Sequence, residues 1–550
     1  MEFKKYFQEN FIYDAKAGFI TGIVALPLAI AFAIASGVPP IMGLYTAVIA
    51  GMITSIFGGS TFSITGPTGA MTVIILATVN KFGLEGLMLA GFLAGLFQLI
   101  LGAIKLGKLI KYIPLPIVSG FTAGIGIIIF IGQIPNFFGL SIPTQEHVWQ
   151  MLLEIAKNIN SASIVALMIA VITILLLVFL PKLLSRYSFL KNIPASIIAL
   201  VLSTAAAYFF SLPVPQVGSI PSQIPSFSTI KFNITLIYVV LPAAFTIAML
   251  GSIESLLCAV VCDGMTNTKH NSNRELVAHG FANMALPFFG AIPATAAIAR
   301  SAVNVKEGAR TRFSCFIHSV FILITILFIG PVARYIPKAF LAGILIFVSV
   351  KMINIHEIKT IMHISRSETI VLFITLLLTV FTDLVFAVQV GMVLAVFLLT
   401  VKFSNVIDIK YMEDYDQKNE INTMINGSPK FRENIGVYTM NGPFFFGAMN
   451  IFETKLDQHM HAKKPFIILR MKHVAFIDST AIVRLNSFLR GRQKKNSHVF
   501  LSTVHPKVKK TLFRDEEFVE LINKEHMFDT TQEAIEYIRK EYLEKTPAEN

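Results

Sequence analysis

The stretch Ala25-Leu-Pro-Leu-Ala-Ile-Ala-Phe-Ala33 lies inside a run of 64 consecutive residues, from Ala17 to Asn80, that contains no Lys, Arg, Asp or Glu. A helix needs about 20 apolar residues to cross a bilayer, so this run has room for about three crossings. Of the 550 residues in the chain, 54% are hydrophobic and 14% are charged, whereas soluble globular proteins carry about 25% charged residues. The sequence therefore predicts a polytopic α-helical membrane protein and excludes an ordinary cytosolic enzyme.

Charge is distributed unevenly along the chain. Residues 1–403 hold 24 Lys and Arg against 13 Asp and Glu, whereas residues 404–550 hold 22 against 20. Most of the net charge of +13 thus lies in the apolar part, as expected for cytoplasmic loops, and it does not indicate a nucleic-acid partner. We expect the following division: a cytoplasmic N-terminal segment at 1–17, a transmembrane domain at 18–403, a linker at 404–432 and a cytoplasmic domain at 433–550.

Charge-free runs, punctuated by Gly and Pro, predict 14 membrane segments. If both termini are cytoplasmic, the inside loops and N-terminus hold 17 Lys and Arg and the outside loops hold five, which supports that orientation. The segments are 18–36, 41–57, 67–79, 84–104, 116–133, 162–180, 192–210, 238–258, 276–290, 295–304, 313–330, 338–350, 368–382 and 385–402.

Two of these segments follow a Gly- or Pro-containing break. The breaks are Ser63-Ile-Thr-Gly-Pro-Thr-Gly-Ala70 before the third segment and Gly290-Ala-Ile-Pro-Ala-Thr-Ala-Ala297 before the tenth. Because they stand seven segments apart, matching segments of the two halves would cross the membrane in opposite directions, as in an inverted repeat. Interrupted segments at matching positions point to the midplane substrate site of a secondary transporter.

A helix that begins inside the bilayer directs free backbone N–H groups and a positive dipole end at the gap before it. Two such ends are expected to form an anion site, where small residues let the ligand approach and hydroxyls donate to it. The alternative is that Gly-, Ala- and Thr-rich helices simply pack closely. The expected substrate-binding residues are Thr65, Gly66, Thr68, Gly69, Ala70, Thr295, Ala296, Ala297, Arg300 and Ser301.

Two charged residues, Arg300 and Glu254, fall within predicted membrane segments and away from the segment ends, where charge is costly and functional roles are common. Arg300 offers a fork of donors that suits a carboxylate or a sulfate. Its structural alternatives are a pairing with Glu254 or a side chain that reaches the membrane interface. Glu275 is expected at the cytoplasmic start of a helix, where capping explains it as well as function does.

No cofactor, metal site or disulfide is expected from the sequence. The cysteines lie in apolar stretches, and the histidines lack the spacing of metal ligands. The sequence contains no nucleotide-binding motif, so ATP-driven transport is not expected. The residues concerned are Cys258, Cys262, Cys315, His270, His279 and His318.

The tail has a different pattern. Residues 466–471 and 497–502 read as strands, and residues 479–489 and 531–542 as helices, which predicts a small α/β domain.

Together the motifs resemble the sulfate permease (SulP) family of anion transporters over nearly the whole chain. Besides the stretches quoted above, they are Gly37-Val-Pro-Pro-Ile-Met-Gly-Leu-Tyr45, Asn273-Arg-Glu-Leu-Val-Ala-His-Gly-Phe-Ala-Asn283 and Ala297-Ile-Ala-Arg-Ser301. The stretch 250–266 is most similar to DauA-type C4-dicarboxylate transporters, and the tail resembles a STAS domain. The resemblance implies two inverted seven-segment repeats, core and gate domains, a homodimer in the bacterial inner membrane, and Arg300 as the positive charge at the anion site.

The tail carries one candidate regulatory residue. Ser479 matches the turn at which anti-sigma-factor antagonists carry a phosphorylatable serine, so the resemblance implies regulation by phosphorylation there and a cytosolic partner. The structural alternative is that the turn serves only to let Asp478 cap the following helix.

The resemblance implies secondary active transport, and we expect elevator-like uptake of C4-dicarboxylates such as succinate, fumarate or aspartate. The alternatives are sulfate or bicarbonate transport, or a membrane-anchored regulator that acts through its STAS domain.

Sodium-coupled bicarbonate relatives carry an Asp at the position of Glu254 and a hydroxyl residue one turn later, where this chain has Cys258, a poor sodium ligand. A carboxyl group held away from water favours its protonated form, so we expect proton symport with Glu254 as carrier. The alternative is that Glu254 only neutralises Arg300.

Overall fold

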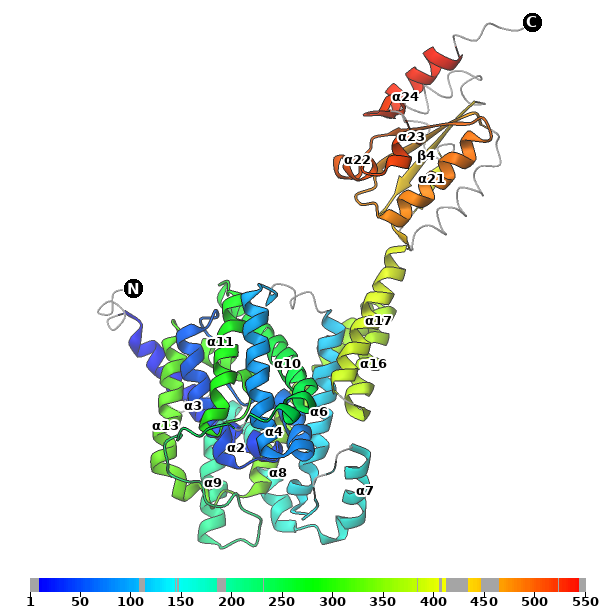
Figure 1. Ribbon diagram of the computed structural model, residues 1–550. Helices are drawn as coiled ribbons and strands as arrows, with labels where there is room; N and C mark the ends of the chain where they lie inside the picture. The colour runs from blue at the N-terminus through cyan, green and yellow to red at the C-terminus, as the bar shows by residue number, and fades with distance from the viewer. Residues whose placement is uncertain are drawn as a thin grey trace, which may run out of the picture. The chain divides into compact units, whose positions relative to one another are not determined.

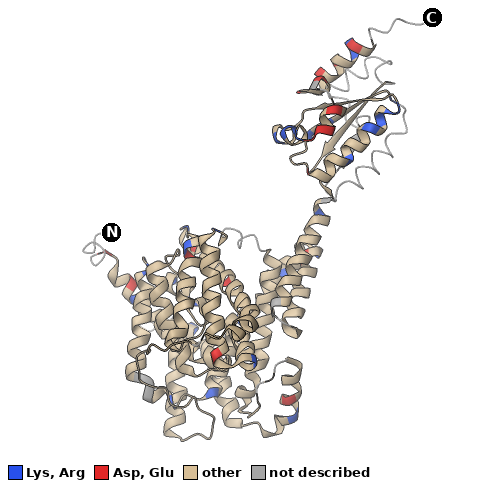
Figure 2. Ribbon diagram, viewed as in Figure 1, with Lys and Arg blue, Asp and Glu red and all other residues tan. Residues whose placement is uncertain are grey.

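A computed structural model describes residues 9–107, 114–143, 145, 148–184, 194–230, 232–382, 384–404, 408–411, 434–446, 464–522 and 524–543. The chain forms two compact units, residues 1–393 and 394–550 (Figure 1). Lys, Arg, Asp and Glu are sparse in the helical body of the first unit and frequent in the second (Figure 2). The boundary between the two units falls within α17 (Leu384–Ser404), and the expected domain limits stay a prediction.

The first unit is built of helices with two very short strands between them. The elements are α2 (Phe11–Ala35), α3 (Pro40–Phe57), β1 (Thr65–Gly66), α4 (Gly69–Ala103), α6 (Leu115–Phe138), α7 (Val148–Asn158), α8 (Ile164–Leu184), α9 (Ala195–Phe209), α10 (Ile234–Thr266), α11 (Ser272–Ala285), β2 (Thr295–Ala296), α12 (Ile298–Lys306), α13 (Phe313–Ala333), α14 (Lys338–Met352), α15 (Ile355–Ile364), α16 (Arg366–Phe381) and α17 (Leu384–Ser404).

Eight helices in the described part of the chain are long and apolar enough to cross a membrane. One of them, α4, joins two of the predicted segments across Gly83, where the backbone leaves the helical conformation with φ 67° and ψ −174°. Other predicted segments correspond to helices too short to count by themselves, such as α12 with nine residues. The number of 14 crossings therefore stays a prediction.

The helices pack in two groups. In the first group, α4 packs on α10 and α11, and α13 packs on α2 and α3. In the second group, α14 and α16 pack on α6, while α8 packs on α14 and α9. The first group contains both chain breaks, and the two groups match the core and gate domains implied by the resemblance.

Several helices begin earlier than the sequence predicts, and for α2 and α11 the structure shows the reason. Helix α2 begins at Phe11 rather than residue 18, since the carboxylate of Asp14 is buried and accepts hydrogen bonds from the backbone N–H groups of Arg310 and Thr311, at 2.7 and 3.0 Å. Helix α11 begins at Ser272 rather than residue 276, because the side chain of Asn271 caps its N-terminus.

The second unit is an α/β domain with a five-stranded sheet in the order β3-β4-β5-β6-β7. Strand β3 (Asp408–Tyr411) runs antiparallel to β4 (Ile435–Asn441), and β5 (Phe466–His473), β6 (His498–Ser502) and β7 (Met527–Phe528) continue in parallel. Because β3 belongs to the sheet, the expectation that residues 404–432 form only a linker is wrong for residues 408–411. The other residues from 412 to 432 lie outside the described part.

Alternate residues of the central strand face opposite layers of this domain. Ile467 and Leu469 of β5 join the apolar cluster that includes Leu485 of α21 (Ser479–Gln493), whereas Ile468 joins the cluster that includes Ile535 of α24 (Thr531–Ile538). Helices therefore cover both faces of the sheet, as parallel strands require. The strands and helices predicted in the tail are confirmed.

Candidate functional site

The two chain breaks meet in the interior of the first unit. Strands β1 and β2 pair antiparallel, with Thr65 opposite Ala296 and Gly66 opposite Thr295. Each strand leads into a helix within three residues, α4 at Gly69 and α12 at Ile298. Within the described part of the chain, no side chain caps the N-terminus of either helix, which leaves the first N–H groups of both helices available to a ligand.

The place where β1 and β2 pair, between the starts of α4 and α12, is called the crossing below. Helix α10 brings a carboxylate to it. The Oε2 atom of Glu254 lies 2.9 Å from Oγ1 of Thr68 and 2.8 Å from Oγ1 of Thr295, and these two hydroxyl oxygens lie 3.0 Å apart. The three oxygen atoms thus form a triangle in which each pair is within hydrogen-bonding distance. One hydroxyl comes from each half of the chain.

A small cavity of about 30 Å³ lies beside Glu254. Its lining includes Ala70 at the start of α4, Phe121 of α6, Leu250 of α10 and Val388 of α17. A single water needs at least about 10–15 Å³ measured in this way, so the cavity has room for about two waters. It lies where α6 and α17 cover the start of α4.

Arg300 lies on the first turn of α12 and is buried, with 1% of its surface exposed. Its Nη2 atom donates a hydrogen bond of 2.6 Å to the carbonyl oxygen of Pro67, whereas Nη1 has no hydrogen-bond partner among the residues that the structure describes. Among the described residues, no ion pair joins Arg300 to Glu254, and the side chain is buried inside the protein rather than extended to its surface. Neither structural alternative weighed for Arg300 in the sequence therefore describes this geometry.

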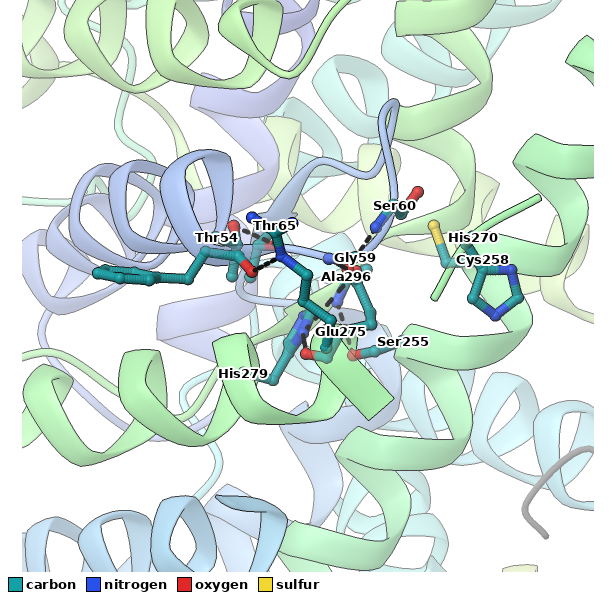
Figure 3. Close-up of polar contacts among 12 residues, drawn as sticks. Thr54, Gly59, Ser60, Thr65, Ser255, Cys258, His270, Glu275, His279 and Ala296 are labelled. Atoms are coloured by element: carbon teal, nitrogen blue, oxygen red, sulfur yellow. Dashed lines mark hydrogen bonds and ion pairs between the residues drawn. The ribbon is translucent and has the colours of Figure 1, made fainter. Parts of the chain in front are cut away.

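Other expected site residues hold the crossing together. The hydroxyl of Ser301 accepts hydrogen bonds from the backbone N–H of Ile64, at 2.8 Å, and from the thiol of Cys258, at 3.1 Å. The hydroxyl of Thr54 donates to that of Thr65 at 2.9 Å, as Figure 3 shows. Thr65 and Ser301 thus have partners inside the protein and act here as scaffold residues.

The backbone N–H groups of the second break are held in the same way. The N–H of Ala296 donates to the hydroxyl of Ser255 at 3.2 Å (Figure 3). The N–H of Ala297 donates to the carbonyl oxygen of Ile64 at 2.9 Å. Ala297 is half-buried, and the next two residues of α12 are exposed. Hydrogen bonds therefore hold the centre of the crossing, whereas the first two residues of α12 are exposed.

Glu275 supports the crossing from a neighbouring loop. Its Oε2 atom accepts hydrogen bonds from the backbone N–H groups of Gly59 and Ser60, at 2.7 and 2.8 Å (Figure 3). Since Asn271 caps α11, Glu275 ties α11 to the loop that follows α3, a structural role that differs from capping its own helix.

One supporting residue was not singled out by the sequence. The side-chain amide of Asn283 accepts from the N–H of Ala294 at 2.8 Å and donates to its carbonyl oxygen at 3.1 Å. It also donates to Oε1 of Gln98 at 2.8 Å. A fully buried amide pair in apolar helices is the signal that could have identified it.

In the second unit, Ser479 is the first residue of α21 and is exposed. The side chain of Asp478 caps this helix by accepting from the N–H of Ala481 at 2.8 Å, and it also accepts from that of Phe446 at 3.0 Å. The capping role is thus present, and phosphorylation of Ser479 stays a prediction. The described residues contain no group of three His, Cys, Asp or Glu side chains placed to hold a metal ion.

Comparison with known proteins identifies both units. Residues 11–375 match the sulfate permease family, and residues 428–534 match the STAS domain. The chain is 36% identical to the putative sulfate transporter YvdB of Bacillus subtilis over 96% of its length and 98% of that protein. It is 34% identical to the bicarbonate transporter BicA of Picosynechococcus, covering 79% and 78%. The fold is that of the murine anion transporter Slc26a9, with a TM-score of 0.85 at 20% identity over 97% and 92%.

Proposed function

Since the chain belongs to the sulfate permease family of membrane anion transporters and carries a STAS domain, we propose that it moves a small inorganic oxyanion, sulfate or bicarbonate, together with a proton. The observation that carries this proposal is the paired crossing of β1 and β2, at which two uncapped helix N-termini and the free Nη1 of Arg300 come together. Free N–H groups, helix dipoles and a guanidinium all favour an anion.

We propose sulfate or bicarbonate rather than the C4-dicarboxylates expected from the sequence, because the relatives described above are named for sulfate and bicarbonate. Uptake of succinate, fumarate or aspartate remains the competing prediction.

The oxygen triangle supports proton coupling. Three mutual hydrogen bonds need three hydrogens, and the hydroxyls of Thr68 and Thr295 supply only two. A proton on Oε2 of Glu254 would supply the third and close the ring. Loss of one negative charge would also favour a bound anion nearby, so proton and anion would assist each other's binding.

Sodium coupling is the alternative for the same atoms, because hydroxyl and carboxylate oxygens also suit a hard cation. The thiol of Cys258, one turn after Glu254, donates to Ser301 rather than facing the triangle. A sodium ion at the triangle would therefore have one side-chain ligand fewer here than in a protein that carries a hydroxyl residue at position 258.

Transport requires the site to open. The small cavity beside Glu254 is bounded by α4 and α10 of the first helix group and by α6 of the second. An anion can enter only if the two groups separate, and this supports an elevator-like movement of the core group. A homodimer in the bacterial inner membrane, with both termini cytoplasmic, completes the proposal.

Uptake into proteoliposomes tests the proposal. Labelled sulfate, bicarbonate and succinate should be compared under an inward proton gradient, an inward sodium gradient and no gradient. We expect saturable sulfate or bicarbonate uptake that is driven by protons and indifferent to sodium. Succinate as the preferred substrate, or a sodium requirement, would reject the corresponding part of the proposal. A protein that moves no anion but binds a cytosolic protein would be the membrane-anchored regulator instead.

A further inference from the structure

A large apolar cavity lies in the first unit, apart from the crossing of β1 and β2. Its volume is about 610 Å³. One wall is formed by α9, with Leu200 and Ala205, and the other by α2, α3 and α13, with Ile30, Leu44 and Ile326. These helices can be followed in Figure 1. Since α9 belongs to the second helix group and the other three to the first, the cavity lies on the boundary between the groups.

This cavity needs a hydrocarbon occupant. Protein interiors are close-packed, and an apolar space does not hold water well because it offers too few hydrogen-bonding partners. Three of its lining residues, Val201, Phe209 and Val332, are more than half exposed. In a protein that spans a membrane, such exposed apolar side chains face lipid, so acyl chains have direct access to the cavity.

The mouth of the cavity carries groups typical of the membrane–water interface. Arg334, which follows the last residue of α13, is exposed. Its guanidinium lies 4.6 Å from the ring centroid of Tyr335 and donates a hydrogen bond to the hydroxyl of Tyr335. The ring of Tyr208 from α9 lies 4.8 Å from that of Tyr335. Tyrosine rings and Arg side chains are enriched at the level of lipid headgroups.

The charge of Arg334 is available to a headgroup. Among the described residues, no carboxylate lies within ion-pair distance of its guanidinium, and all three mouth residues belong to the cavity lining. Arg binds phosphate through paired N–H donors and more specifically than a simple point charge does. A cation at the open end of an apolar slot matches an acyl chain linked to a phosphate.

We infer that this cavity binds one acyl chain of an anionic phospholipid, with the phosphate of the lipid on Arg334. The bound lipid fills the boundary between α9 and the group of α2, α3 and α13. Because a ligand that binds the folded protein stabilises it, the lipid should raise the melting temperature and should remain with the purified protein. This inference does not depend on which anion is transported.

Lipid retention and thermal stability test the inference on the full-length protein in detergent. Bound phospholipid is counted by mass spectrometry after extensive washing, and melting temperatures are measured with added phosphatidylglycerol or phosphatidylcholine. The wild-type protein should retain at least one phospholipid per chain and be stabilised more by phosphatidylglycerol. Arg334→Gln should bind phosphatidylglycerol about tenfold more weakly, which removes the preference over phosphatidylcholine.

Matched variants separate the cavity from the general lipid belt. Ala205→Phe fills the cavity and should abolish retention of the lipid, whereas Ala206→Phe, one residue along α9 and outside the lining, should behave as wild type. Lys338→Gln removes another nearby cation outside the lining and should keep the phosphatidylglycerol preference. The inference is overturned if wild-type protein retains no phospholipid, if Ala205→Phe retains as much as Ala206→Phe, or if Arg334→Gln and Lys338→Gln behave alike.

Discussion

Gly66 lies so close to Arg300 that a Cβ atom added to Gly66 would stand 2.7 Å from Nη1 of the guanidinium. The absent side chain thus leaves the space in which the free end of Arg300 lies beside β1. Both residues are buried, and Arg300 is also fixed by its hydrogen bond to Pro67. The position of the buried positive charge therefore depends on a glycine in the opposite half of the chain.

Gly66→Ala should displace Arg300 and reduce anion uptake at least about tenfold, because the charge would be moved away from the proposed anion site. Initial uptake rates and the melting temperature of the purified protein measure the effect. Gly132→Ala is the matched control, since nothing lies within 4 Å of a Cβ added to Gly132. Wild-type uptake by Gly66→Ala would show that Arg300 does not need this position.

Arg300→Ala should weaken substrate binding strongly while the protein remains folded and inserted. A hydrogen bond to a charged group contributes about 1.5–3 kcal/mol, so the dissociation constant should rise about 10- to 150-fold. Arg300→Lys should recover only part of the affinity, because the single ammonium nitrogen lacks the planar fork whose two terminal nitrogens lie at separate positions, one on Pro67 and one free for the ligand. Equilibrium binding to purified protein checks both variants, with size-exclusion profiles as the folding control. An unchanged affinity in Arg300→Ala would remove Arg300 from the site.

Glu254→Gln should abolish the response of uptake to a proton gradient while some anion binding or exchange persists. Glutamine keeps the shape and hydrogen-bonding capacity of a protonated glutamate but cannot release the proton. For the wild type, uptake should rise as the external pH falls, since proton entry accompanies anion entry. Thr295→Val removes one hydroxyl from the triangle and should weaken the pH response, whereas Thr295→Ser should preserve it. A wild-type pH response in Glu254→Gln would reject the mechanism.

The sequence identified the elements of the site better than the contacts among them. The Gly and Pro residues of the two breaks mark the crossing because they interrupt otherwise continuous apolar segments. Their spacing cannot show that Thr68 and Thr295 meet on one oxygen of Glu254, nor that Thr65 and Ser301 bond within the scaffold. Those outcomes depend on side-chain directions set by the pairing of β1 with β2.

Long-range pairing also explains the errors at element boundaries. A charge such as Asp14 ordinarily ends an apolar segment, but here N–H groups about 300 residues away satisfy its carboxylate, so the helix continues past it toward the N-terminus. Strand β3 has only four residues and is recognisable only by its pairing with β4, whose first residue lies 24 positions after the end of β3. The local sequence pattern reveals neither the N–H groups that pair with Asp14 nor the strand that pairs with β3.

Strand β3 determines how the contribution of the STAS domain should be tested. A deletion of residues 430–550 would keep β3 but remove β4, leaving the backbone groups of a strand without a partner and prone to aggregation. A deletion of residues 405–550 instead ends the chain at the last residue of α17.

Every residue of the crossing precedes position 305, so the 1–404 protein should bind sulfate or bicarbonate with a dissociation constant within about twofold of wild type. Its transport rate or assembly should fall, because the α/β domain is absent. Binding assays, uptake rates and size-exclusion profiles measure the three properties, and loss of anion binding by a monodisperse 1–404 protein would show that the substrate site is not confined to the first unit.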